Sequence, residues 1–242
     1  MQYADDLTEA TTDYGIVEHV KETLPKVLKK SKLDINKSKT EEYTVKYKGN
    51  ENWKDCKLLG NKLGTQKDIA RRKGLTINAI NDLQYIFKSK HISLQVKVRM
   101  FKVYVESIFL YNSELWTLTL NMKKQIDQFQ RRLIRTHVLQ VRYPRIIKNT
   151  EVYKITNIKS WCDTIEKRRL RWYGHLIRLP VNSPARKAYE ICKLPTKRPK
   201  GRHTLTWMSM MKTQLQNINL TINEAEETAM DKIKWKQICN ND

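Results

Sequence analysis

The spacing of hydrophobic positions changes along the chain, and each change predicts a different secondary structure. Residues 16–30 carry apolar side chains at helical spacing, and Pro25 is expected to interrupt that helix. Leu33–Asn36 and Tyr43–Tyr47 alternate apolar and polar residues, which predicts two strands. Cys56–Gly60 follows a Gly-Asn turn signal and ends in glycine, so we expect a tight hairpin there.

From Lys67 onward the hydrophobic spacing is that of amphipathic helices. The first predicted helix runs from Lys67 to about Phe87, the second begins at Ser93 as its N-cap, and the third begins near Asn121. Short loops join them, so their apolar stripes are most simply explained as the core of a small bundle that ends near residue 140.

The remaining residues predict fewer elements. A fourth helix is expected over about Ile158–Arg178, with Trp161 and Trp172 on one face and therefore packed in a core. Residues 179–203 hold four of the six prolines, which predicts a basic linker without a core of its own. A last helix is expected over Asn223–Gln237. The whole pattern predicts an α+β chain, with strands at the start and mostly helix afterwards.

The charge of the chain is strongly positive and unevenly distributed. Lys and Arg number 47 against 25 Asp and Glu, a net charge of +22. Residues 1–66 hold 12 basic and 11 acidic side chains, residues 67–140 hold 14 and 5, and residues 141–242 hold 21 and 9. An excess that rises along the chain favours contact with nucleic-acid phosphates over a general solubility charge, with an acidic membrane surface as the weaker alternative.

Several classes of protein and site are excluded. No apolar run approaches the roughly 20 residues that cross a bilayer, and the acidic start lacks the features of a signal peptide, so a nuclear or cytoplasmic protein is expected. The four cysteines and five histidines are scattered, without zinc-site spacing or a thiol nucleophile motif. We expect reduced thiols and no small-molecule cofactor, and the sequence leaves the oligomeric state open.

One short motif carries chemistry. Tyr3-Ala4-Asp5-Asp6 places adjacent carboxylates at the tip of a short strand hairpin, as a two-metal phosphoryl or nucleotidyl transfer site requires, because Mg²⁺ prefers anionic oxygen ligands beside substrate phosphates. Neighbouring side chains of a strand point to opposite faces, so one aspartate is expected to ligate the metal and the other to support it. The alternative is an acidic, frayed N-terminus.

The motifs of the chain, in order, resemble the C-terminal part of a non-LTR (LINE-type) retrotransposon reverse transcriptase. Gln2–Asp6 looks like the metal-binding box of the palm, and Leu33–Thr40 looks like the next palm motif with its Asn-x-x-Lys-Thr pattern. Leu58-Leu59-Gly60 resembles the primer-grip hairpin, and Leu110–Trp116 is similar to the thumb's Leu-Tyr-Gly-Ser-Glu-x-Trp. Arg169–His175 looks like part of the family's basic tail, as do residues 197–207.

The resemblance implies a division of the chain and a role for each part. It implies a partial palm over 1–48, a primer-grip hairpin over 49–66, a helical thumb over 67–140 and a basic nucleic-acid-binding region over 141–242. Its partners would be an RNA template and a DNA primer or target, with no membrane contact.

Site residues follow by the same resemblance. Asp5 and Asp6 would hold Mg²⁺, Lys39 would face the phosphates of the nucleotide, and Leu59 and Gly60 would lie under the primer end. Lys39 suits that role because a positioned ammonium can neutralise or protonate departing pyrophosphate; its alternative is a solvated lysine. The nucleic-acid contacts expected in the tail are Lys167, Arg168, Arg169, Arg171, Lys197, Arg198, Lys200 and Arg202. Such a basic run can also be a solvated face or an import signal.

The sequence departs from the family at three places. Lys32 and Asn112 stand where the family usually has glycine, and asparagine tolerates a left-handed backbone. The family's other metal-binding aspartate and its fingers belong upstream of the box. We therefore expect this chain alone not to extend a primer, and its thumb to be the most stable part.

Two other functions stay open at this stage. One is a non-catalytic, basic nucleic-acid-binding remnant of a decayed element. The other is an unrelated helical interaction protein, for which the ordered matches are accidental. Metal-dependent primer extension separates the polymerase from the remnant, and salt-sensitive binding of nucleic acid separates both from the third.

Overall fold

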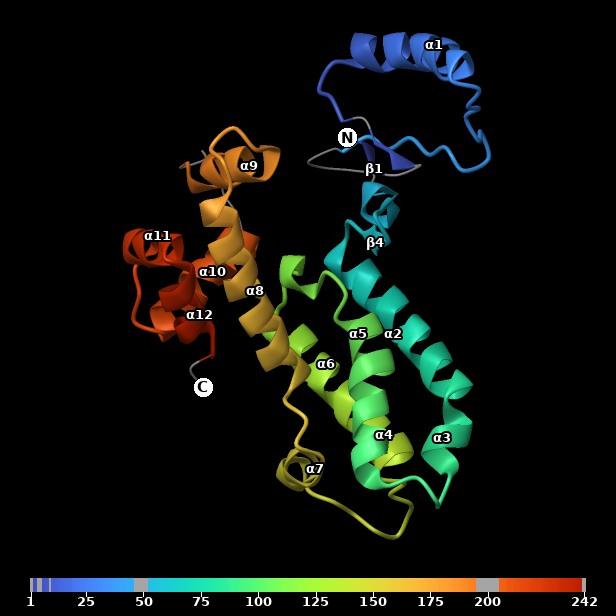
Figure 1. The fold of residues 1–242 in the computed structure, drawn as a ribbon, viewed down its shortest axis with the longest axis vertical. Helices are drawn as coiled ribbons and strands as arrows, with labels where there is room; N and C mark the ends of the chain where they lie inside the picture. The colour runs from blue at the N-terminus through green and yellow to red at the C-terminus, as the bar shows by residue number, and fades with distance from the viewer. Residues whose placement is uncertain (1, 4–5, 9, 46–51, 195–204, 241–242) are drawn as a thin grey trace. The chain divides into compact units, whose positions relative to one another are not determined.

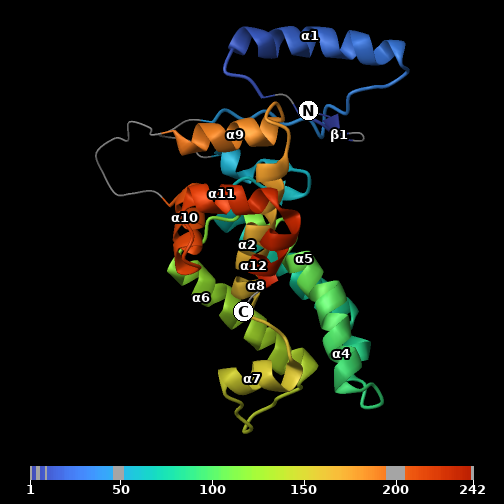
Figure 2. The same ribbon diagram turned by 60° about the vertical axis from the view of Figure 1, so that its left-hand side comes forward.

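A computed structural model describes residues 2–3, 6–8, 10–45, 52–194 and 205–240. The chain divides into two compact units, residues 1–68 and 69–242. The division falls within one helix, α2 (Thr65–Asp82), and two residues beyond the expected start of the thumb at Lys67. Figures 1 and 2 show the elements of both units.

The described residues of the first unit form two small antiparallel hairpins and one long helix. Its elements, in chain order, are β1 (Gln2–Tyr3), β2 (Asp6–Leu7), α1 (Tyr14–Lys30), the 3₁₀ turn η1 (Asn52–Asp55), β3 (Lys57–Leu58) and β4 (Asn61–Lys62). Strand β1 pairs with β2, and β3 pairs with β4. The expected hairpin at Cys56–Gly60 is therefore confirmed.

Helix α1 is continuous, so the expected interruption at Pro25 is wrong. Asp13 caps its start, where Oδ1 accepts a hydrogen bond of 2.8 Å from Gly15 N. A proline inside a helix removes one backbone donor. In α1 that loss does not end the helix, and no residue of α1 is buried against another element.

In the described part of the chain, neither of the two strands expected after α1 is formed. Leu33–Asn36 has no regular structure, Tyr43–Val45 has none either, and residues 46–47 lie outside the described part of the chain. For the first of these segments Asn36 gives the physical reason, because its side chain accepts hydrogen bonds from Ser38 and so draws the backbone into a turn.

The second unit is built from helices. After α2 they are, in chain order, α3 (Gln84–Lys88), α4 (Leu94–Met100), α5 (Ser107–Phe109), α6 (Leu120–Leu133), α7 (Asn149–Thr156), α8 (Trp161–Arg178), α9 (Pro184–Lys193), α10 (Trp207–Asn217), α11 (Ile222–Met230) and α12 (Lys232–Asn240). The π-helical turns η2 (Phe101–Glu106) and η4 (Ile134–Val138) extend α4 and α6, and the 3₁₀ turn η3 (Ser113–Leu115) precedes α6. The α+β description thus holds, with helix predominant.

Several helix predictions are confirmed at their ends. Ser93 caps α4, where its Oγ accepts from Val96 N at 3.4 Å, and the third helix starts at Leu120, one residue before the expected position. The fourth begins at Trp161, three residues after the expected start near Ile158, with Ser160 as its N-cap, and it ends at Arg178 as expected.

The predictions after α8 need three corrections. The expected linker contains α9, whose Tyr189 is buried. The expected last helix is two helices, α11 and α12, because the Asp231 carboxylate accepts from the backbone of Ile233 and Lys234 and starts a new helix. Helices α7 and α10 were not expected at all.

Two hydrophobic cores form in the second unit, and α8 belongs to both. The N-terminal half of α8 contributes Trp161 and Ile165 to the first core, which also contains residues of α2–α6. Its C-terminal half contributes Leu170, Tyr173 and other residues to the second core, with α9–α12. Figure 1 shows α8 running between these two groups of helices. The cores therefore meet within α8 and not at residue 140.

Trp161 is part of the first core, so the prediction that it packs in a core is confirmed. It is fully buried, and its ring stacks on Phe109 with centroids 4.1 Å apart. Its backbone N–H donates to Oε1 of the buried Gln130 at 2.9 Å, and Gln130 Nε2 donates to the Lys159 carbonyl. Gln130 therefore ties α6 to the start of α8.

Gly174 explains how α12 approaches α8 in the second core. A Cβ atom at Gly174 would lie 2.2 Å from two ring atoms of Trp235, far closer than two heavy atoms can approach. Trp235 is buried and its Nε1–H donates to the Leu170 carbonyl at 2.8 Å. The close crossing of α8 and α12 therefore requires glycine.

We predict that Gly174→Ala destabilises the second unit by about 1–3 kcal/mol, because Trp235 has to leave its place against α8. Gly74→Ala in α2 is the matched control, since nothing lies within 4 Å of a Cβ at that exposed helical position. The control should gain about 0.5–1 kcal/mol from helix propensity. Urea unfolding of both variants measures the difference, and equal effects would contradict the proposed crossing.

Glu106 in η2 is a carboxyl inside the first core. It is half-buried, and among the described residues neither its Oε2 nor Trp161 Nε1 has a hydrogen-bond partner. Burial raises the pKa of Glu106, and the nearby indole of Trp161, with Lys102 and Arg168, opposes this only in part.

We predict that Glu106→Gln stabilises the fold at neutral pH. A raised folded-state pKa means that the native state holds the proton more tightly than the unfolded chain, so wild-type stability falls as the pH rises from the unfolded value through the folded one. The Glu106→Gln variant has no carboxyl group at this position, so its stability does not fall over that pH range. Urea titrations between pH 4 and pH 8 should show the two proteins converging at low pH; a constant difference would refute this account.

Candidate functional site

The N-terminal box forms a hairpin. Tyr3 of β1 lies opposite Asp6 of β2, so the chain reverses at the box as expected. Asp5 lies outside the described residues. Within the described ranges, no three His, Cys, Asp or Glu side chains gather where they could hold a metal ion. The assignment of Mg²⁺ to Asp5 and Asp6 therefore stays a prediction from the resemblance.

The Asn-x-x-Lys-Thr pattern is one hydrogen-bonded turn. Asn36 Oδ1 accepts from Ser38 N at 3.1 Å, and the Asn36 carbonyl accepts from Lys39 N at 3.1 Å and from Thr40 Oγ1 at 3.0 Å. Lys39 is exposed on this turn. The motif's asparagine and threonine thus shape the backbone that presents the lysine.

Leu59 and Gly60 form the two-residue turn of the β3–β4 hairpin. Both have positive φ, 46° and 79°, as the turns that fit a right-handed hairpin require. Leu59 is half-buried. The hairpin is fixed to its surroundings by Lys62, whose backbone N–H donates to Asp68 Oδ1 at 3.0 Å and whose Nζ donates to Asp55 Oδ1 at 2.8 Å. Hydrogen bonds from Lys62 and Lys67 lower the pKa of Asp55.

The two positions where the family has glycine both have a left-handed backbone. Lys32 has φ 58° and Asn112 has φ 52°. Lys32 closes α1, where its N–H bonds to the Lys29 carbonyl and that of Leu33 bonds to the Leu28 carbonyl. This is the helix end that normally takes glycine. At Lys32 and Asn112 the residue differs from the glycine of the family pattern. The backbone at both positions nevertheless has the conformation that glycine adopts without strain.

The predicted basic run on α8 is largely used within the fold. Lys167 and Arg168 are half-buried, and Arg168 Nη1 donates to the Leu110 carbonyl at 2.5 Å. Arg171 is exposed and its Nη2 donates to Asn240 Oδ1 at 3.0 Å. Of this run, Arg171 has the most accessible side chain.

Arg169 lies at the junction of the two cores, and only 1% of its surface is exposed. Its Nη2 donates to the Trp116 carbonyl at 3.1 Å and its Nη1 to Gln214 Oε1 at 3.3 Å. Burial lowers its pKa. A guanidinium in this place cannot reach a phosphate on the surface, so the expected role of Arg169 in binding nucleic acid is corrected to a role in packing.

Trp172 is less buried than expected, since it was predicted to pack in a core on the same face of α8 as Trp161. It is half-buried, and its ring lies 5.4 Å from that of His175, centroid to centroid. Helix α12, which contacts α8 through Trp235 and Asn240, exposes Lys232, Lys234 and Lys236. These cations were not among the contacts predicted from the sequence.

The remaining predicted contacts lie outside the described residues. These are Lys197, Arg198, Lys200 and Arg202. Helix α9, which precedes them, is held by Tyr189. The Tyr189 hydroxyl bonds to Glu226 of α11 at 2.5 Å, and Lys193 Nζ lies 2.7 Å from the same carboxylate oxygen. The basic segment therefore begins at a helix anchored in the second core.

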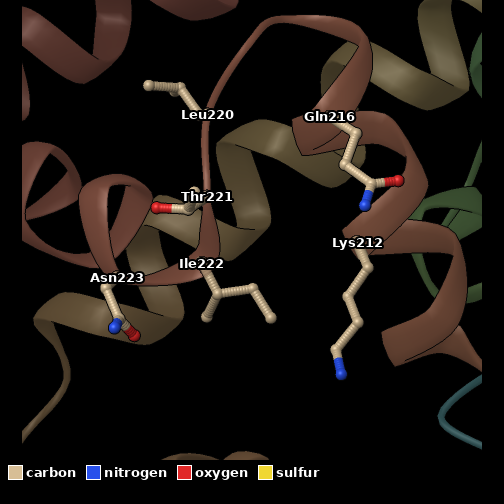
Figure 3. Close-up of a pocket in the computed structure, with 6 residues that line it drawn as sticks. All are labelled: Lys212, Gln216, Leu220, Thr221, Ile222 and Asn223. Carbon is tan, nitrogen blue, oxygen red and sulfur yellow. The ribbon is translucent and has the colours of Figure 1, made fainter.

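A shallow hollow of about 340 Å³ lies between α10 and α11 (Figure 3). Lys212 and Gln216 of α10 line one side, and residues 220–223 line the other. Lys212 is its one charged lining residue. The hollow contains none of the motif residues, so it contributes nothing to the candidate site.

Comparisons with known proteins add no identification. No family model, no curated protein and no solved structure matches the chain. Among the helices that the structure describes, none combines the length and apolar character needed to span a membrane.

We predict that substitution of Arg169 destabilises the fold and that substitution of Arg171 does not. Arg169→Met should lower the free energy of unfolding by about 1–3 kcal/mol, because it removes two buried hydrogen bonds, to the Trp116 carbonyl and to Gln214. Arg171→Met should change stability by less than about 0.5 kcal/mol, as expected at an exposed position. Urea unfolding monitored by circular dichroism tests both, and an Arg169 variant as stable as the wild type would argue against the packing role.

Proposed function

We propose that this chain is the palm end, thumb and basic C-terminal region of a non-LTR retrotransposon reverse transcriptase, and that its helical unit holds the nucleic acid. The observation that carries the proposal is the left-handed backbone at Lys32 and Asn112. The motif comparison places glycine at both positions from sequence alone, and the backbone has a glycine-like conformation at both. Positive φ also occurs at Leu59, Gln140, Asn157 and Asn219, and the agreement at both motif positions supports the resemblance.

The charge of the helical unit supports the binding part of the proposal. Residues 69–242 hold 34 Lys and Arg against 13 Asp and Glu, so carboxylates of this unit can neutralise at most a minority of its cations. Residues 1–68 are nearly neutral, with 13 against 12. Several carboxylates are already paired, since Glu166 binds Lys123, and Glu190 and Glu226 bind Lys193. An anionic partner is the simplest use for the remaining charge.

The polymerase part of the proposal rests on motif chemistry. Lys39 is exposed on a turn that its own motif shapes, as a residue facing phosphates should be. The β3–β4 turn offers the half-buried Leu59 and Gly60 as a rigid support for a primer end. In the full-length enzyme, Mg²⁺ at Asp5 and Asp6 would supply two-metal activation of nucleotidyl transfer. The described residues do not form a metal site by themselves, so we derive no catalytic step from them.

We predict that the purified chain binds a primed RNA template with an affinity that falls steeply with salt. Displaced counterions should give a slope of log K against log[KCl] of several units, and a loss of about 10²-fold or more between 50 and 200 mM. Fluorescence anisotropy measures it. Absence of binding at 50 mM, or an affinity that salt leaves unchanged, would overturn the proposed nucleic-acid role.

A primer-extension assay separates the polymerase from a remnant that only binds. With Mg²⁺ and deoxynucleotides, we expect the 242-residue chain not to extend the primer. The motifs by which it resembles the family do not include the family's upstream metal-binding aspartate or its fingers. Joined to an upstream segment that carries them, the chain should extend the primer, and Asp5→Asn with Asp6→Asn should abolish extension. Extension that survives this double substitution would exclude the proposed metal site.

A further inference from the structure

The loop between η4 and α7 exposes apolar and basic side chains together. Tyr143 is 94% exposed and Ile146 is 88% exposed, more than any other large apolar side chain of the described residues. Arg142, Arg145 and Lys148 beside them are exposed as well. No Asp or Glu occurs in the sequence between Asp127 and Glu151. In both ribbon views the loop extends beyond α7 (Figures 1 and 2).

The base of this loop is held firmly. Arg135 of η4 bridges it, because its Nη2 donates to the Ile147 carbonyl at 3.0 Å and to Asn149 Oδ1 at 2.6 Å, while its backbone carbonyl accepts from Val141 N at 2.8 Å. Ile147 is buried in the first core. At the tip, Arg145 N donates to the Arg142 carbonyl at 3.0 Å and closes a turn. The exposed residues thus stand on an ordered, anchored turn.

We propose that residues 142–148 bind single-stranded nucleic acid, with the Tyr143 ring stacked on a base and Arg142 and Arg145 on the flanking phosphates. Single-strand binders combine aromatic faces with cations in this way, because every base offers a stacking surface and every linkage a negative charge. The inference rests on the proposed function and adds to it a residue, a mode of contact and a preference for unpaired strands. Bases inside a duplex are already stacked and cannot accept the ring.

The same side chains could in principle meet an anionic membrane surface. The exposed apolar part is small, since it consists of one ring and one isoleucine on a turn, whereas interfacial binding usually uses the whole face of an amphipathic helix. The Lys and Arg residues are also distributed over the whole second unit, as expected for a protein that binds an extended polyanion. Nucleic acid therefore fits the loop better, and membrane binding becomes an outcome of the test.

The test compares four forms of the full chain by fluorescence anisotropy with labelled 20-nucleotide RNA, DNA of the same sequence, and the DNA duplex. Tyr143→Ala should weaken binding of both single strands by roughly tenfold, and binding of the duplex by less than about twofold. Tyr143→Trp should bind the single strands at least as well as the wild type. Tyr14→Ala is the matched control, because Tyr14 is 69% exposed but follows Asp13 in a stretch of sequence without Lys or Arg before Lys21, and this variant should bind like the wild type.

Each outcome bears on a different claim. Salt-sensitive binding that is the same for Tyr143→Ala and the wild type overturns the stacking proposal and leaves the proposed function intact. Equal losses on single strands and duplex also overturn it. If the wild type binds none of the three probes, both proposals fail. Vesicles of phosphatidylcholine with phosphatidylserine complete the experiment: a Tyr143-dependent association with them, without an effect on oligonucleotides, would assign the loop to a membrane. Thermal unfolding checks that the variants are folded.

Discussion

The second unit depends on one helix that two cores share. Helix α8 ends one hydrophobic core with Trp161 and Ile165 and starts the next with Leu170 and Tyr173. Between these pairs lies Arg169, for which the described residues provide no ion pair. Its Nη1 and Nη2 are hydrogen bonded to Gln214 and to the Trp116 carbonyl, and its buried Nε has no hydrogen-bond partner among those residues. A buried guanidinium is costly to desolvate, so these two hydrogen bonds make the position of α8 depend on the segment around Trp116 and on α10.

Because α8 packs in two cores, only part of its positive charge is accessible to a binding partner. The arginines of α8 looked like a binding surface in the sequence because four cations occur within five residues. In the structure Arg169 is buried, Arg168 binds a backbone carbonyl, and Arg171 remains accessible. Exposed cations that the motifs did not single out lie on α12 and on the loop before α7. Net charge therefore indicates the class of partner, and burial decides which residues meet it.

Local signals in the sequence predicted much of the fold. Ser93 and the periodicity after it gave the start of α4, and Gly60 marked the β3–β4 hairpin, because caps and turns depend on a few neighbouring residues. Predictions failed where a competing local interaction was overlooked. Asn36 turned an expected strand into a turn, and Asp231 divided an expected helix in two. The role of Arg169 could not be predicted, since it depends on contacts 45 and 53 residues away in the chain.

The position of Trp161 also bears on which part of this chain can stand alone. Its ring stacks on Phe109, and its backbone is held by Gln130, so the thumb-like helices complete their interior with a side chain that belongs to the following region. A truncation at residue 140 would leave Phe109 facing solvent across an open groove, and the shortened bundle would tend to associate through that face. A fragment that keeps the first core complete therefore has to include α8. The boundary that the motifs predict, at residue 140, differs from the boundary that the packing of the cores sets.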